Sequence, residues 1–415
     1  MTSDGVQAMF IYKVGVVGAG TMGAQIAQAI TFGGIPVVLT DVSEDLARRG
    51  IQTVRKIYQG RVEKGKMTAE QLEEKMLLVT AAAGPNALSD VDLVIEAAPE
   101  DLKVKQALFR ELDRACPSGA ILASNTSALS ISALGAATKR PEKVIGLHFF
   151  NPAYAMPLVE VIPGLATDPQ TVQDVLGFAE GIRKAPVVVK ECAGFLVNRL
   201  LMAYLNEAVL CLQEGAAFTN EIDQAMTAFG MPAGPFTLLD RVGLDISLEV
   251  ARILHQSYGP RMQPAALLEA MVKAGRLGMK TGRGFYAYGD APGVERDPEL
   301  ERLIASVRDG AGRMATPWSP DRLLLAMVNE AVMALQEGVA SARDIDFAMM
   351  AGTGFPGDKE GPLHYADQVG IDRVLRQLEE FTRTLGTRFW PAPMLRRMVD
   401  GGFMGRQTGR GFFPY

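Results

Sequence analysis

The 415-residue sequence has few of the residues that build disulfide frameworks and zinc sites. It contains three histidines and only three cysteines, Cys116, Cys192 and Cys211. The odd cysteine count and the irregular spacing fit neither a disulfide framework nor a metal motif, so we expect no metal site. Reduced structural thiols in a cytoplasmic protein are the simpler interpretation, and we predict a cytoplasmic location.

Long apolar runs and an excess of basic residues are also missing. No apolar run approaches the roughly 18 residues that suggest a membrane span, so we expect no membrane partner. The formal net charge is −5. Nucleic-acid-binding domains usually carry a basic patch, so we expect no nucleic acid as a partner. Residues 1–7 contain no arginine, which predicts a short tail and not a signal or transit peptide.

What the sequence does have is a first part in which apolar, strand-like runs alternate with helical segments. One helix is expected at residues 22–32, and another opens with the capping-box pattern Thr68-Ala-Glu-Gln71. The alternation predicts a doubly wound α/β domain at residues 1–190, with a parallel sheet and helices on both faces. The expected strands lie at residues 11–17, 37–40, 92–98, 120–124, 144–149, 158–161 and 186–189.

The second part is mainly helical, and it repeats. Arg199-Leu-Leu-Met-Ala-Tyr-Leu-Asn-Glu-Ala-Val209 matches Arg322-Leu-Leu-Leu-Ala-Met-Val-Asn-Glu-Ala-Val332 at an offset of 123 residues (322 − 199). The offset becomes 127 at Gly234 against Gly361, so the second copy carries four extra residues. Agreement of this length indicates a duplicated helical unit, in which each copy buries an apolar face against the other.

The duplication sets the expected domain organisation. We predict two repeated all-α domains, at residues 191–290 and 321–415. A linker rich in proline, glycine and charge should occupy residues 291–320, with one helix near residues 299–307.

A glycine-rich segment, Gly18-Ala-Gly20-Thr-Met-Gly23, follows the first expected strand and opens a helix. The first glycine permits a tight turn, the second lets the backbone approach a pyrophosphate, and the third allows close helix–strand packing. Asp41 ends the next strand, where a carboxylate can hydrogen-bond ribose hydroxyls and repel a 2′-phosphate. We therefore predict NAD as cofactor; the alternative is a glycine-rich turn beside a solvated aspartate. The predicted NAD-binding residues are Gly18, Gly20, Thr21, Met22, Gly23 and Asp41.

His148, in His148-Phe-Phe-Asn-Pro152, lies at the end of an expected strand. Ligands of doubly wound sheets bind beyond the carboxyl ends of the strands. A histidine placed there can accept a hydroxyl proton as hydride leaves. Glu160, on the next expected strand, would orient the imidazole and stabilise the imidazolium. These residues predict alcohol oxidation by a nicotinamide cofactor; the alternatives are a hydrogen-bonded core histidine and a strand-edge charge.

Two polar residues could contact the reacting oxygen. Ser127 follows the strand at residues 120–124, and its alternative role is a helix N-cap. Asn198 starts the first long helix of the second part, where its amide could approach a carbonyl oxygen that gains charge. Its alternative role is simple capping. The repeat places Asp321 at the matching position with no histidine motif before it, so the second copy is expected to be structural.

Together these motifs resemble the 3-hydroxyacyl-CoA dehydrogenases over nearly the whole chain. The resemblance implies oxidation of an L-3-hydroxyacyl-CoA to the 3-ketoacyl-CoA, with hydride transfer to NAD, as in fatty-acid β-oxidation. It rests on the glycine-rich segment, on Ile95-Glu-Ala-Ala-Pro-Glu100, Ser124-Asn-Thr-Ser127, His148-Phe-Phe-Asn-Pro152 and Glu160, and on Gly194-Phe-Leu-Val-Asn-Arg199.

The resemblance also implies residue roles. His148 would be the general base, Glu160 its partner, and Ser127 and Asn198 hydrogen-bonding groups around the substrate. From the residues alone, Glu100 and Lys105 are typical of an exposed helix start, and Lys280 of a loop charge. In the family, the positions that contact NAD correspond here to Glu100, Lys105, Asn151 and Lys280.

The CoA end departs from the family pattern. Family members carry a serine and a lysine on the helices after the second strand, where this chain has Val54 and Arg61. The stretch is nevertheless basic, which suits CoA phosphates, although a solvated helix face is the plainer interpretation. Arg61 is the candidate substrate-binding residue. The basic residues are Arg55, Lys56, Arg61, Lys64 and Lys66.

The tandem helical part resembles the dehydrogenase portion of the multifunctional fatty-acid oxidation proteins. Single-copy relatives dimerise through this domain, so we expect a monomer with an internal pseudo-dimer, or a homodimer. No hydratase–isomerase region precedes the glycine-rich segment, which predicts a stand-alone dehydrogenase working beside separate hydratase and thiolase proteins. The active site is expected in a cleft between the Rossmann domain and the first helical copy. The competing hypotheses are a sugar-acid dehydrogenase of the L-gulonate type and a non-catalytic NAD-binding subunit.

Overall fold

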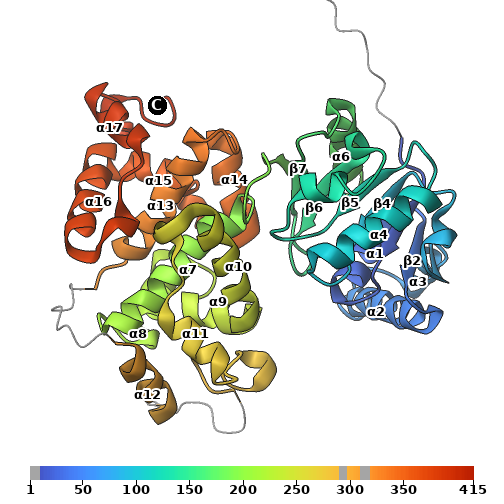
Figure 1. Cartoon of the computed structure of the whole chain (residues 1–415), viewed down its shortest axis with the longest axis horizontal. Coiled ribbons are helices and arrows are strands. Elements are labelled where there is room, and N and C mark those ends of the chain that lie inside the picture. Colours follow the sequence, from blue (N-terminus) through green and yellow to red (C-terminus); the bar gives the residue numbers. More distant parts are fainter. Residues whose placement is uncertain (1–9, 289–296, 309–317) are drawn as a thin grey trace, which may run out of the picture. The chain divides into compact units, whose positions relative to one another are not determined.

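The computed structural model describes residues 10–288, 297–308 and 318–415. It divides into two compact units, Met1–Phe195 and Leu196–Tyr415 (Figure 1). The tail predicted at residues 1–7 and parts of the linker predicted at residues 291–320 lie outside the described residues. No helix in the described ranges is long and apolar enough to cross a membrane.

The N-terminal unit is built on an eight-stranded sheet with the order β3-β2-β1-β4-β5-β6-β7-β8. Its first six strands pair in parallel, in the order expected of a Rossmann sheet. The predicted α/β fold of this part is confirmed. The strands are β1 (Val14–Val17), β2 (Val37–Asp41), β3 (Val79–Ala83), β4 (Leu93–Glu96), β5 (Ile121–Ser124), β6 (Val144–Phe149), β7 (Leu158–Pro163) and β8 (Ala185–Val188).

Two features of the sheet differ from the prediction. The strand β7 runs antiparallel to β6, so the extension of a parallel sheet through residues 158–161 was wrong in direction. Only eight residues separate the two strands (158 − 149 − 1), too few for the crossover that a parallel connection needs. The strand β3 was not predicted, because its sequence VTAAA is poor in the β-branched and aromatic residues that mark strands.

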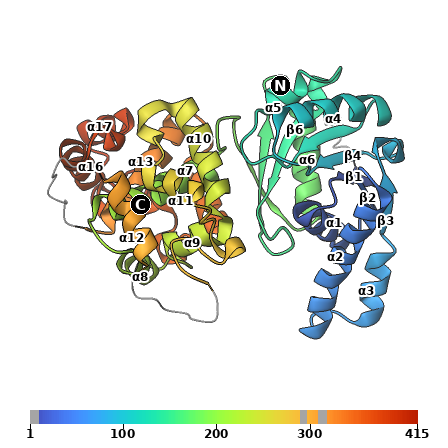
Figure 2. The same cartoon turned by 60° about the horizontal axis from the view of Figure 1, so that its bottom comes forward.

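Helices cover both faces of the sheet (Figure 2). One core joins Ile26 of α1, Tyr58 of α2 and Val175 of α6 to alternate strand residues such as Val16. On the other face Gly146 of β6 lies against Ile131 of α5. The helices are α1 (Thr21–Phe32), α2 (Glu44–Glu63), α3 (Ala69–Met76), α4 (Leu102–Ala115), α5 (Ile131–Gly135) and α6 (Pro169–Gly181). The predicted capping box of Thr68 and Gln71 is present at the start of α3.

The C-terminal unit contains both helical copies, which confirms the predicted repeated all-α part. The first copy has α7 (Val197–Glu214), α8 (Thr219–Phe229), α9 (Pro235–Val242), α10 (Leu244–Tyr258) and α11 (Ala266–Lys273). The second has α13 (Asp321–Gln336), α14 (Ala342–Thr353), α15 (Pro362–Val369), α16 (Ile371–Leu385) and α17 (Pro393–Asp400). Between them lies α12 (Pro298–Val307), the helix expected near residues 299–307. Contact within the unit is densest between α7 and α13.

Candidate active site

The glycine-rich turn between β1 and α1 has the shape of a phosphate cradle. Gly18 has a φ of +98°, and a Cβ there would lie 2.6 Å from the Ala97 carbonyl oxygen. A Cβ on Gly23 would lie 1.8 Å from the Gly18 oxygen, whereas one on Gly20 would meet no atom within 4 Å. The open side of the turn is therefore at Gly20, the N-cap of α1, where no side chain caps the helix. Free N–H groups at a helix start suit a pyrophosphate, so these residues fit a dinucleotide.

Thr21 and Met22 form the first turn of α1 beside this opening, and Thr21 is exposed. Asp41, at the end of β2, accepts the Ala19 N–H at 2.8 Å through Oδ2 and the Val42 N–H at 2.7 Å through Oδ1. The carboxylate is thereby fixed next to the cradle. A carboxylate has about four lone-pair sites, so two remain for ribose hydroxyls.

His148 and Glu160 form a buried pair at the end of β6. They are direct neighbours across the antiparallel β6–β7 ladder, and His148 Nδ1 lies 2.7 Å from Glu160 Oε2. His148 is 7% exposed and Glu160 is 0% exposed. A neutral imidazole that donates its Nδ1–H to the carboxylate keeps Nε2 as a proton acceptor. The structure thus brings together the two residues predicted as base and partner.

Two aromatic rings flank the imidazole. The Phe150 ring centroid lies 4.5 Å from that of His148, and the Phe195 centroid lies 5.9 Å away. Phe195 is buried and has a φ of 49°, a left-handed conformation that is uncommon outside glycine. Both rings limit the orientations open to the imidazole. Neither aromatic residue was given a role from the sequence, although Phe150 lies within the histidine motif.

Lys105 is buried, so the interpretation of the start of α4 as exposed was wrong for this residue. Its side chain is 1% exposed, and its Nζ lies 2.6 Å from Glu96 Oε1, 3.0 Å from the Ala98 oxygen and 3.3 Å from Glu100 Oε2. Glu96 is itself fully buried and accepts the Ser124 hydroxyl at 2.6 Å. All three ammonium protons therefore have an acceptor within the protein. Glu96, missed from the sequence, was detectable as a carboxylate inside the apolar run LVIE.

Glu100 connects this buried cluster to the loop after β5. Its Oε1 accepts the Thr126 hydroxyl at 2.5 Å and the Ser127 N–H at 2.9 Å. Ser127 is not a helix N-cap, because that position of α5 belongs to Ser130. The alternative role of Ser127 is therefore wrong. The neighbouring Asn125 accepts the Phe149 N–H at 2.8 Å, which ties the ends of β5 and β6 together at one edge of the sheet.

Asn151 lies just beyond β6 and contacts the helix of the cradle. Gln25 of α1 donates to Asn151 Oδ1 at 3.2 Å and accepts the Ala153 N–H at 2.7 Å. The loop after the histidine is thus anchored to α1. Asn151 is placed on the same side of the sheet as the phosphate cradle, where the family resemblance expects a contact with NAD.

Two predicted site residues belong to the C-terminal unit. Asn198 is the second residue of α7 and is half-buried. Lys280 is exposed, and its Nζ lies 2.5 Å and 2.6 Å from the two carboxylate oxygens of Asp245. The cleft expected between the units, and the roles of Asn198 and Lys280 in it, stay predictions.

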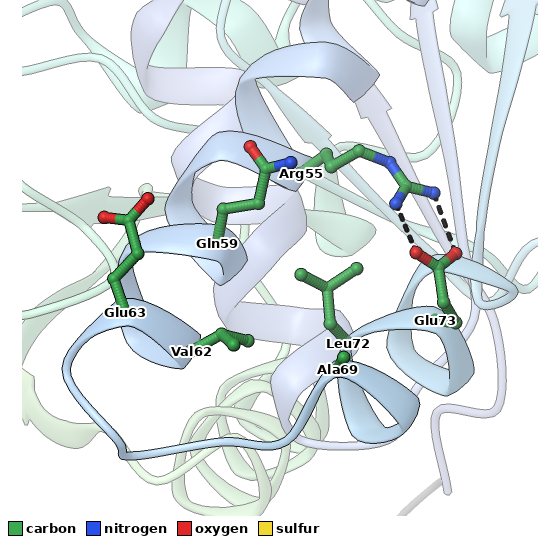
Figure 3. Close-up of a pocket in the computed structure, with 7 residues that line it drawn as sticks. All are labelled: Arg55, Gln59, Val62, Glu63, Ala69, Leu72 and Glu73. Atoms are coloured by element: carbon green, nitrogen blue, oxygen red, sulfur yellow. Dashed lines mark hydrogen bonds and ion pairs between the residues drawn. The ribbon is translucent and has the colours of Figure 1, made fainter.

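Of the basic stretch, Arg55 alone lines a cavity of about 450 Å³ between α2 and α3 (Figure 3). Arg55 closes one side of it through a paired contact with Glu73, at 2.5 Å and 2.9 Å. Arg61 does not line this cavity, because its guanidinium lies 4.3 Å above the Phe32 ring of α1. Its Nε is buried and has no hydrogen-bond partner among the residues that the structure describes. Val54 is fully buried in the core.

Comparisons with known proteins cover nearly the whole chain. Residues 13–192 match the family model "3-hydroxyacyl-CoA dehydrogenase, NAD binding domain". Residues 194–288 and 320–415 each match the C-terminal domain of the same family. The two separate matches agree with the internal repeat.

Individual relatives give the same result. The chain is 39% identical over 399 residues to the fatty acid oxidation complex subunit alpha of Shewanella amazonensis, covering 94% of this chain and 56% of that protein. It is 36% identical over 413 residues to the peroxisomal fatty acid beta-oxidation multifunctional protein MFP2 of Arabidopsis thaliana, covering 97% and 57%. The chain therefore spans about half the length of these relatives. The crystal structure of 3-hydroxybutyryl-CoA dehydrogenase from Escherichia coli superimposes with a TM-score of 0.86 at 31% identity, covering 95% of this chain and all of that one.

Proposed function

Because this chain belongs to the 3-hydroxyacyl-CoA dehydrogenase family, we propose that it oxidises an L-3-hydroxyacyl-CoA to the 3-ketoacyl-CoA by hydride transfer to NAD. The observation that carries the proposal is the buried His148–Glu160 pair at the carboxyl end of β6, 2.7 Å between Nδ1 and Oε2. It lies in the same Rossmann sheet as a cradle that fits a dinucleotide. A proton acceptor beside a hydride acceptor is what alcohol oxidation requires.

His148 acts as the general base. Its Nε2 takes the proton of the substrate hydroxyl as the carbonyl forms, which makes the ring an imidazolium. The Glu160 carboxylate stabilises that charge and holds the ring through Nδ1. Phe150 and Phe195 restrict the orientation of the ring.

The cofactor would be held mainly by residues at the ends of β1, β2, β4 and β6. The N–H groups around Gly20, Thr21 and Met22 bind the pyrophosphate, with Gly18 and Gly23 shaping the turn. The Asp41 carboxylate accepts the ribose hydroxyls. Glu100, Asn151 and Lys280 would contact NAD, as the family resemblance implies. We assign Lys105 a positioning role, because its ammonium is saturated by Glu96, Glu100 and the Ala98 oxygen.

Ser127 and Asn198 hydrogen-bond the reacting oxygen. The Ser127 backbone is fixed by Glu100, so its side chain is presented from a rigid loop. The Asn198 amide can donate to an oxygen whose negative charge grows, an interaction that is stronger in the transition state than in the ground state.

The substrate class follows from the family and from the basic surface of α2. We propose that the CoA phosphates are bound near this helix, with Arg61 released from the Phe32 ring to reach them. We also propose a cytoplasmic protein that associates with hydratase and thiolase. Its two helical copies would give a monomer the internal equivalent of a dimer.

A substrate panel tests the proposal. Purified protein is mixed with NAD and either L-3-hydroxybutyryl-CoA, a longer L-3-hydroxyacyl-CoA, or L-gulonate as a free acid, and NADH absorbance is followed. The proposal predicts NADH formation with the thioesters and none with the free acid. Activity on L-gulonate alone would assign a sugar-acid dehydrogenase. NAD binding without activity on any substrate would assign a non-catalytic subunit.

A further inference from the structure

The two longest described helices of the C-terminal unit, α7 and α13, lie side by side (Figures 1 and 2). Buried arginines join them. Arg199 lies in the first turn of α7 and is 0% exposed. Its Nε is 2.6 Å from Glu330 Oε1. Its Nη1 and Nη2 are 2.7 Å and 3.0 Å from the two oxygens of Glu337. All three guanidinium nitrogens of this first-copy arginine are thus bound by carboxylates of the second copy, while its guanidinium also lies 4.3 Å from the ring centroid of Tyr258 in the first copy.

The reverse contact is also present. Arg322 in the first turn of α13 donates to Glu207 and to Glu214, both at 2.6 Å. Arg322, Glu330 and Glu337 stand 123 residues after Arg199, Glu207 and Glu214 (322 − 199), the offset of the repeat. The two helices therefore run antiparallel and exchange the same contacts about a pseudo-two-fold axis.

The charged residues that α7 and α13 exchange each lie where they stabilise the dipole of the other helix. A positive charge in the first turn of a helix and a negative charge at its end both oppose that helix's own dipole. Here Arg199 faces the end of α13, and Glu337 is the C-cap of that helix and faces the start of α7. Each charge therefore favours the neighbouring helix. Burial works against the charge of Arg199, but Glu337 and Glu330 outweigh it and raise its pKa.

The two arginines differ in their surroundings. Within the described part of the chain, Nη1 of Arg322 is buried without a hydrogen-bond partner, whereas all three guanidinium nitrogens of Arg199 are hydrogen-bonded. The preceding residue differs too, since Asn198 comes before Arg199 and Asp321 before Arg322. The more completely held arginine is the one next to the proposed catalytic asparagine. Neither N-cap residue, Leu196 or Pro320, caps its helix with a side chain.

We propose that Glu330 and Glu337 of the second helical copy are positioning residues for the reaction: they lock Arg199, and through it the first turn of α7 and the Asn198 amide. The inference rests on the function proposed above. Consecutive helix residues point about 100° apart, so Arg199 can face α13 while Asn198 faces elsewhere. This gives the second copy a catalytic purpose although it lacks a histidine motif of its own. A chain with a single copy would need these carboxylates from a second chain.

The internal symmetry provides a matched control. Glu337→Gln removes one partner of Arg199, and Glu214→Gln removes the equivalent partner of Arg322. Their side chains are 41% and 35% exposed, so both variants are expected to fold. Glu214 also accepts from Arg388 at 3.0 Å, so Glu214→Gln should lose at least as much thermal stability as Glu337→Gln. Only Glu337→Gln should lower kcat, by about tenfold, because misplacing a catalytic group by less than 1 Å has an effect of that order. The KM for NAD should stay unchanged in both variants.

A double-mutant cycle separates positioning from general stability. In an Asn198→Ala background, Glu337→Gln should change kcat less than about twofold, because the group it positions is gone. Equal kcat values for Glu337→Gln and Glu214→Gln would overturn the inference, and so would an undiminished effect in Asn198→Ala. If Glu337→Gln does not fold, Glu337→Asp against Glu214→Asp makes the same comparison. If the wild-type protein is inactive, the proposed function itself is overturned. If it is active but Glu337→Gln and Glu214→Gln have equal kcat values, only this inference is overturned.

Discussion

His148 and Glu160 face each other across an antiparallel strand pair, with Nδ1 of the imidazole 2.7 Å from Oε2 of the carboxylate. The reversal of the chain after β6 is what creates this pair. Side chains directly opposite in an antiparallel ladder lie on one face with their Cβ atoms about 5 Å apart. The end of the Rossmann sheet is thus also the point at which the base receives its partner.

Replacing the partner should weaken the base. Glu160→Gln keeps the size of the side chain but removes the charge that stabilises an imidazolium. We expect kcat to fall by about 10²-fold or more, within the range of general base catalysis. Stopped-flow measurement of NADH formation, with circular dichroism to confirm folding, checks this. A kcat within about twofold of wild type would show that Glu160 has only a structural role in the core.

Asp41 should determine the choice between NAD and NADP. Asp41→Ser removes a charge that would repel a 2′-phosphate and an acceptor for the ribose hydroxyls. A hydrogen bond to a charged group contributes about 1.5–3 kcal/mol, so KM for NAD should rise about tenfold or more. The ratio of kcat/KM for NADP to that for NAD should rise with it. Asp41→Asn is the control, because it can still accept the Ala19 N–H. An unchanged cofactor ratio in both variants would contradict the assignment.

Lys105 should contribute more to folding stability than to cofactor binding. Lys105→Met leaves the fully buried Glu96 carboxylate without its counter-charge, which typically destabilises by about 3–5 kcal/mol. Urea unfolding of this variant and of the Lys105→Met/Glu96→Gln double variant measures the effect. The double variant should recover part of the loss. A single variant as stable as wild type with weaker NAD binding would assign Lys105 directly to the cofactor.

The second helical copy should impose a pH dependence on stability. Burial raises the pKa of Asp346 to about 6, although the Leu363 and His364 N–H groups and the His364 ring hydrogen-bond it. The folded protein therefore holds this proton more tightly than the unfolded chain, whose value is near 3.8. The contribution of Asp346 is most favourable below about pH 4 and is lost as pH rises through about 6.

The magnitude can be measured against Asp346→Asn, which cannot titrate. Between about pH 4 and pH 6, the free energy of unfolding of wild type should fall relative to the variant by on the order of 3 kcal/mol, and then level off. Urea unfolding of both proteins across this range provides the comparison. A difference that grows in favour of wild type as pH rises would show the opposite sign and refute the raised pKa.

Much of the fold could be predicted from the sequence, because periodicity and turn residues mark it directly. The alternation of strands and helices, the duplicated helices and the capping box of Thr68 all follow local rules. The direction of β7 could not be predicted by such rules, since an apolar strand has the same sequence pattern in either orientation. The strand β3 escaped because its register with β2 is fixed by pairing and not by its own alanine-rich sequence.

The candidate site was less accessible to sequence reasoning. His148 and the glycine cradle are marked by motifs, so they could be identified. The burial of Lys105 could not, because it depends on Glu96 of a different element, nine residues away, folding beneath it. Arg199 and Glu330 are 131 residues apart in the sequence, and they come into contact only when the two copies pack together. Such contacts depend on tertiary packing and have no local signature.

The most direct test of the account is hydride transfer by wild type and His148→Gln under single-turnover conditions with NAD and L-3-hydroxybutyryl-CoA. NAD binding is measured separately by fluorescence in both proteins. The account predicts rapid NADH formation by wild type, loss of about 10²–10⁴-fold in rate for His148→Gln, and equal affinity for NAD. Wild-type rates in the variant, or no NADH from wild type with any CoA thioester, would contradict it.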